Sequence, residues 1–133
     1  DTSKVTDMSY MFYNCRALTP IPLLDTSKVT DMSSMFYNCQ ALTTIPLLDT
    51  SKVTDMRAMF FECSNLTEIH MTGMKTSFNI AASTKFTRDA LVEILNNLAT
   101  VTSTKTLTMG STNLAKLTDE DKAIATNKGW TLA

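Results

Sequence analysis

Residues 25–48 read DTSKVTDMSSMFYNCQALTTIPLL, and nearly the same 24 residues stand on both sides of this stretch. The copy at residues 1–24 differs from it at three positions, and the copy at residues 49–72 still matches it at 14 of 24. No residue is inserted or lost between the copies. A fixed period of this length is the signature of repeat architectures, in which each unit stacks on the next.

Each repeat has two halves with different hydrophobic periods. In the middle copy, apolar residues from Met32 to Cys39 follow the i, i+3, i+4, i+7 spacing of one helix face, which predicts a short helix. Residues 42–47 then alternate apolar side chains with Thr and Pro, which predicts a short strand with one buried face. Together the two halves give these expected inner positions: Val29, Met32, Met35, Phe36, Cys39, Leu42, Ile45 and Leu47.

One repeat alone buries too few side chains to offset the entropy lost on ordering its backbone. Stacked copies bury these faces against each other and pair their strands, so the array is stable where the unit is not. Pro22 and Pro46 lie inside the predicted strands and lack an N–H. The strand ladder is therefore expected to be short or interrupted at these prolines.

The repeat fades after Thr72, and residues 73–133 alternate strand and helix patterns. Strands are expected at residues 76–81, 105–109 and 130–132, and helices are expected to begin after Thr87 and Thr118, which can cap them. Gly129 is placed to end the second helix. A solenoid end exposes an apolar face and a strand edge, so we expect residues 73–133 to form a C-terminal cap within the same domain as repeats 1–72.

The string V-T-D-M-x-x-M-F-x-x-C-x-x-L-T-x-I occurs three times within residues 1–72. In this it resembles the BspA-like leucine-rich repeats of bacterial surface proteins, a repeat type also found in mycoplasma lipoproteins and in some phage-associated proteins. The resemblance implies an α/β leucine-rich-repeat solenoid, in which a short parallel sheet lines a concave face and short helices form the convex side. It also implies adhesion or protein binding, and it carries over no catalytic residue.

Composition and charge argue against several classes of partner. Twelve Lys and Arg against thirteen Asp and Glu give a net charge of −1, without the positive surplus that binding to nucleic acid or to an anionic membrane requires. No apolar run approaches the roughly 18 residues of a membrane span. We therefore expect no nucleic-acid partner and no membrane insertion by this segment.

Repeated thiols and carboxylates, and a lone histidine, are the candidates for chemistry. One cysteine per repeat (Cys15, Cys39, Cys63) predicts a column of buried thiols that does not converge on a zinc ion, although a disulfide between adjacent layers stays open. The aspartates that recur every 24 residues are explained by turn and cap roles without calcium. His70 is expected to be an exposed strand residue and not a catalytic base, because Cys63, seven residues away, faces the helix side of the unit. We therefore expect no enzymatic activity, no metal and no cofactor.

The outward positions of the predicted strands are the first candidate for a ligand-binding surface. This face is rich in threonine, weakly charged and without an acidic pair in a cleft, which argues against a glycosidase. It suits weak or multivalent contacts; a merely solvated strand face is the equal alternative. The candidate residues are Thr19, Thr43, Thr44, Thr67, Glu68 and His70.

The function expected from these observations is a non-enzymatic binding or adhesion module, monomeric and secreted or on the cell surface. Its partner would be a protein or glycan on a host or neighbouring cell. The alternative is a structural spacer, or a component of a phage particle, without a specific ligand. The outward positions differ between repeats, with Pro22 and Pro46 where the third copy has His70, and this divergence favours recognition.

Overall fold

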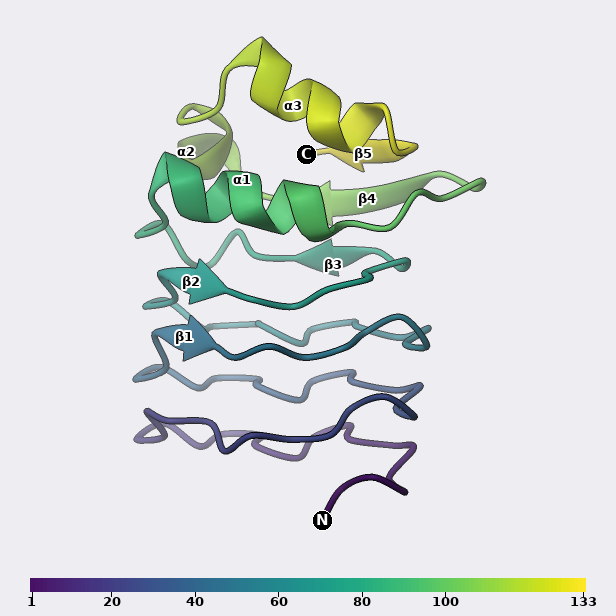
Figure 1. Cartoon of the computed structure of the whole chain (residues 1–133). Coiled ribbons are helices and arrows are strands. Elements are labelled where there is room, and N and C mark those ends of the chain that lie inside the picture. Colours follow the sequence, from purple (N-terminus) through teal and green to yellow (C-terminus); the bar gives the residue numbers. More distant parts are fainter.

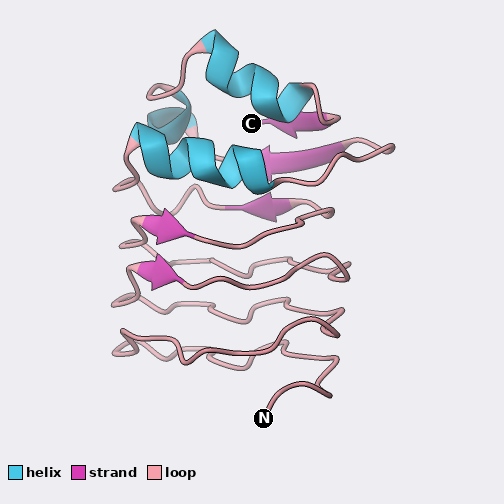
Figure 2. Ribbon diagram, in the orientation of Figure 1, coloured by secondary structure: helices cyan, strands magenta, loops and turns pink.

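The computed structural model describes the whole chain, residues 1–133, as a series of coils that lie one above another (Figure 1). The termini lie at opposite ends of this stack, and the helices gather at its C-terminal end (Figure 2). The strands are β1 (Thr44–Ile45), β2 (Glu68–Ile69), β3 (Phe78–Asn79), β4 (Lys105–Thr108) and β5 (Trp130–Leu132). The helices are α1 (Arg88–Asn97), α2 (Ser111–Leu114) and α3 (Asp119–Thr126).

Equivalent residues of successive repeats lie over one another. β1 and β2 pair in parallel with Thr44 opposite Glu68, a spacing of one repeat. Parallel bridges from Asp7 to Asp31 and from Asp31 to Asp55 continue the same register on another side of the coil. A second parallel sheet has the order β3-β4-β5. The prediction of a short ladder is confirmed, since β1 stops immediately before Pro46 and the first repeat has no strand.

The helix predicted within each repeat is wrong. Residues 33–38 form consecutive turns, and no helix begins before Arg88. Ser34 and Asn38 have φ of 54° and 58°, in the left-handed region that no right-handed helix contains. The equivalent residues of the other repeats share this conformation: Tyr10, Asn14, Ala58 and Glu62.

These turns direct every second backbone N–H out of the coil, while the N–H groups between them donate within the turn, as from Met35 to Met32. We call residues 7–15, 31–39 and 55–63 the first, second and third turn segments. In the first two, every second N–H donates to a carbonyl of the next segment at 2.7–3.0 Å, as from Met32 to Asp55 and from Phe36 to Met59. Bonds between coils thus replace the bonds within a helix, and the apolar side chains still point inward.

The interior of the stack is built from columns of identical residues. The rings of Phe12, Phe36 and Phe60 stack with centroids 5.6 and 6.1 Å apart and planes within 8° and 4° of parallel. Leu47, predicted to be buried, is 62% exposed, and Leu48 is buried in its place. β1 ends at Ile45, and side chains alternate between inside and outside only within a strand. The alternation therefore does not predict which residues after Pro46 are buried.

The C-terminal segment confirms both predicted helix starts. The Thr87 side chain accepts from the Ala90 N–H at the start of α1, and Thr118 forms a capping box with Asp121 at the start of α3. Arg88 on α1 binds Asp121 through two nitrogens at 2.7 and 2.8 Å, which ties the two helices together. Nothing in these contacts tests the leucine-rich-repeat class or the division into repeats 1–72 and cap 73–133. Both therefore remain predictions.

Candidate binding surfaces

Most of the predicted strand-face residues come together, but their polar groups largely bind one another. The Thr43 carbonyl accepts from both the N–H and the hydroxyl of Thr67, at 2.8 and 3.2 Å. Thr44 lies opposite Glu68 in the β1–β2 ladder. Thr19 is exposed one coil earlier, where the chain forms no strand. The assignment of these residues to a ligand remains a prediction.

The expectation that His70 stands free in solvent is wrong. Its side chain is only 35% exposed and lies between two carboxylates, with Nδ1 2.6 Å from Glu93 Oε2 and Nε2 3.0 Å from Glu68 Oε2. Glu93 belongs to α1, which follows the repeats and packs against β2. The hydrogen bond to Glu93 is the largest influence on the pKa of His70 and raises it, with Glu68 adding to the effect.

His70 should therefore make the stability of the chain depend on pH. A raised pKa in the folded state means that the imidazolium stabilises the fold fully below its unfolded pKa of about 6.5. This contribution is lost as the pH rises through the folded pKa. Urea denaturation of wild type and Glu93→Gln from about pH 5 to about pH 9 should show a flatter profile for the variant. Identical profiles would mean that the contact to Glu93 does not stabilise the charged ring.

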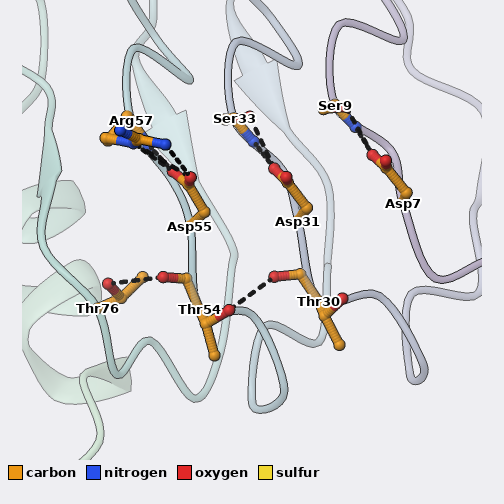
Figure 3. Close-up of polar contacts among 9 residues, drawn as sticks. All are labelled: Asp7, Ser9, Thr30, Asp31, Ser33, Thr54, Asp55, Arg57 and Thr76. Carbon is orange, nitrogen blue, oxygen red and sulfur yellow. Dashed lines mark hydrogen bonds and ion pairs between the residues drawn. The ribbon is translucent and has the colours of Figure 1, made fainter.

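The repeated aspartates serve the turns, as predicted. Asp7, Asp31 and Asp55 each accept from the N–H two residues later, at 2.8, 2.8 and 3.0 Å (Figure 3). Hydrogen bonds from Ser9 lower the pKa of Asp7, and those from Arg57 lower the pKa of Asp55. No three His, Cys, Asp or Glu side chains form a group that could hold a metal ion.

The threonines that recur beside these aspartates join the coils. The Thr30 hydroxyl donates to the Thr6 carbonyl, and the Thr54 hydroxyl donates to the Thr30 carbonyl at 3.3 Å. Thr76 repeats the contact on Thr54, so the column reaches beyond the third repeat (Figure 3). These side chains contribute to stacking and are not free for a ligand.

The column of buried thiols is confirmed for Cys39 and Cys63. Their Sγ atoms donate to the carbonyls of Phe12 and Phe36 in the preceding coil, at 3.1 and 2.9 Å. Burial raises the pKa of Cys39 to about 11 and that of Cys63 to about 12. Such thiols are protonated at neutral pH, which makes them poor nucleophiles and poor metal ligands.

A second aromatic column lies on the outside of the turn segments. We call Tyr13, Tyr37 and Phe61 the outer aromatic column; its neighbouring rings stack with centroids 4.7 Å apart and planes 23° and 25° from parallel. Tyr10 packs against Tyr13 at 5.6 Å. Tyr10 is 60%, Tyr13 42% and Phe61 50% exposed. The sequence analysis missed this surface, although an aromatic residue directly after the inner phenylalanine of each repeat signals it.

A groove lies where the third turn segment meets β3. A cavity of about 400 Å³ is lined by Ala58, Phe60, Phe61, Glu62, Asn79, Ala81 and Ala82. A second cavity of about 260 Å³ adjoins it, since both share Ala58 and Asn79. We call the two together the junction groove. A wider hollow of about 690 Å³ opens at the N-terminal corner beside the exposed Leu23 and Leu47.

Comparisons with known proteins place the chain by its repeats. A comparison with curated proteins and one with solved structures each find no match. No helix has the length and apolar character needed to cross a membrane. The DUF285 family, described as a Mycoplasma protein of unknown function, matches residues 1–93, which takes in all three repeats and continues into α1. The chain therefore belongs to the DUF285 family.

Proposed function

We propose that this chain is a non-enzymatic binding module of the BspA-like surface-repeat type, with a role in adhesion to a protein or glycan. The observation that carries the proposal is the outer aromatic column with Tyr10 beside it. Soluble proteins rarely leave neighbouring large apolar side chains exposed unless the patch contacts something. Tyrosine and phenylalanine are also enriched at protein interfaces. A secreted or cell-surface location fits this role.

The column is suited to binding because its rings are already held in place. Tyr37 is stacked on both faces, by Tyr13 and by Phe61. Ordering a side chain at an interface costs about 0.5–1.5 kcal/mol, and rings that are fixed beforehand avoid most of this cost. The hydroxyls of Thr30, Thr54 and Thr76 already bind carbonyls of the preceding coil. The exposed aromatic rings have no such partners, so their surface is open to a ligand.

Two other interpretations remain candidates. The strand face around Thr44 and Glu68 is a possible second contact surface, as the sequence predicts. A structural spacer or phage-particle component without a ligand is the alternative function. The near identity of repeats 1–24 and 25–48 is compatible with the spacer, whereas the changes on the strand face of the third copy favour recognition.

A binding screen of the chain against immobilised matrix proteins and glycans tests the proposal. The test variant carries Tyr10→Asn, which suits the φ of 59° at this position, together with Tyr13→Ser. Loss of an aromatic anchor costs about 2 kcal/mol or more, so affinity should fall roughly 30-fold. The matched control, Glu68→Ala with His70→Ala, should bind as wild type does.

The opposite pattern, with loss only in the control, would move the binding surface to the strand face. If no member of the panel binds wild type, the spacer becomes the better description. Circular dichroism of both variants separates loss of binding from loss of fold.

A further inference from the structure

The row of forward-pointing N–H groups ends without partners at the third turn segment. In the first two segments the corresponding N–H groups all donate to the next coil. In the third, the N–H groups of Met56, Ala58, Phe60 and Glu62 donate no hydrogen bond. Met56 and Phe60 are each only 2% exposed. Ala58 and Glu62 are exposed, so the row is accessible, and its unused donors favour an occupant that supplies acceptors.

The C-terminal segment does not supply them because its chain takes another course at this point. The residues one period after Asp55 and Arg57 are Asn79 and Ala81. Asn79 lies in β3 and is paired with Thr108 of β4. Its side chain accepts from the Ala81 N–H at 2.8 Å, as Asp55 does from Arg57, but no carbonyl of residues 79–82 accepts from an N–H of the third segment. The junction groove is the space left between the two.

The groove brings the free donors and contact surface together. Ala58, Phe60 and Glu62 line its larger cavity, so three of the four unpaired N–H groups belong to lining residues. The small side chains of Ala81 and Ala82 form the opposite side. Phe61, covered on one face by Tyr37, completes the apolar lining.

The chain itself shows twice which kind of segment binds such a row of N–H groups. The second turn segment places the carbonyls of Asp31, Ser33, Met35 and Tyr37 on the row of the first, and the third does the same for the second, at 2.7–3.0 Å. A run of N–H groups in turns that alternate with left-handed residues also forms a concavity for electronegative atoms. Peptides commonly bind by adding to such an unpaired backbone edge.

We propose that the junction groove is a peptide-binding site, in which a segment of a partner protein presents the carbonyl oxygens of alternate residues to Met56, Ala58, Phe60 and Glu62. The Phe61 ring and the alanines would contact its side chains. This site shares Phe61 with the outer aromatic column, but its donors lie in the third turn segment and not beside Tyr10 and Tyr13 in the first, and it does not depend on the function proposed above.

The test uses the full chain and a capped peptide, acetyl-DMSSMFYN-amide, that copies residues 31–38. Amide NMR should show shifts at residues 56–62 and 79–82. At a peptide concentration of ten times Kd, hydrogen exchange at Ala58 and Phe60 should slow roughly ten-fold, because exchange then requires dissociation. The amides of Ser34 and Phe36, already bonded to the next coil, should exchange as before.

Two variants locate the binding. Ala82→Leu places a larger side chain in the groove and should weaken peptide binding roughly ten-fold or more. Ala115→Leu makes the same change at an exposed position at the end of α2 and should bind as wild type does. Ala82 is exposed, and the Trp130 indole signal reports whether the variant is folded.

Three outcomes would overturn the proposal: no shifts at millimolar peptide, unchanged binding by Ala82→Leu, or shifts confined to residues 7–13. The last would place the peptide on the unpaired carbonyl edge of the first turn segment. The Tyr10→Asn, Tyr13→Ser variant should bind the peptide normally. A negative peptide experiment would therefore contradict only the groove proposal and not the proposed adhesion function. A negative binding screen against matrix proteins and glycans would contradict only the adhesion function.

Discussion

Replacing Phe36 with alanine is expected to lower the free energy of unfolding by about 3–5 kcal/mol. Phe36 is fully buried and is the middle ring of the inner stack, with Phe12 on one face and Phe60 on the other. The cavity opens between three coils and removes contacts from each of them. Urea denaturation followed by circular dichroism measures the loss.

Phe12→Ala is the matched control for this prediction. Phe12 has the same place in the first repeat, but it is only partly buried and stacks on one ring, Phe36. Its loss should therefore cost clearly less than the loss of Phe36. Equal costs, or a nearly neutral Phe36→Ala, would contradict the view that stacking of the coils supplies most of the stability.

Gly129→Ala is the second change with a large expected effect, about 3 kcal/mol of lost stability from two causes. The backbone at Gly129 has φ of 91°, and an alanine there costs about 1–2 kcal/mol. Its Cβ would also lie 2.6 Å from the Val101 carbonyl oxygen, and forcing such an overlap costs a further 1–3 kcal/mol or so. Val101 cannot easily yield, since its N–H donates to the Lys128 carbonyl at 2.8 Å.

Thermal unfolding, monitored at the neighbouring Trp130, measures this effect. Gly73→Ala is the control, because Gly73 has a similar φ of 74° but its nearest neighbour is the Ser51 Cβ, at 3.1 Å. The control should show the conformational cost with little of the overlap. If both variants lose the same stability, the contact with Val101 is not what requires glycine at position 129.

The sequence predicts the parts of the fold that depend on side-chain type. A 24-residue period places equivalent residues over each other, as the pairing of Thr44 with Glu68 confirms. The helix starts after Thr87 and Thr118 are also confirmed, since capping depends on one side-chain oxygen near its own backbone. α2 was not predicted, because four residues are too few to show a helical period.

The turn segments could not be predicted because their deciding feature is a backbone conformation that their residues do not signal. Asn14 and Asn38 tolerate a positive φ, but Tyr10 and Glu62 take the same conformation without any such preference. The conformation recurs at the equivalent positions of all three repeats whatever the side chain. An apolar spacing of i, i+3, i+4, i+7 is therefore compatible with a helix or with these stacked turns, and one sequence cannot distinguish them.

The candidate sites also include parts that the sequence predicts and parts that it does not. The sequence places the candidate residues Thr44 and Glu68 opposite each other, but the contact of His70 with Glu93 depends on how α1 packs. The junction groove depends on backbone donors, which every residue except proline carries, so no side-chain pattern could indicate it.

The hydrogen bonds between turn segments all point the same way, from the N–H groups of one segment to the carbonyls of the next. The row of turn segments is therefore polar. The third turn segment, which is the last of the row, presents only donors to whatever follows it. Two copies therefore cannot join these edges through a two-fold axis, which would set donor against donor. Only a heterologous contact, in which a different surface supplies acceptors, matches this edge, and heterologous contacts between copies can repeat into an open fibre instead of closing a dimer. The divergent strands and helices after the third repeat interrupt that edge and so oppose polymerisation.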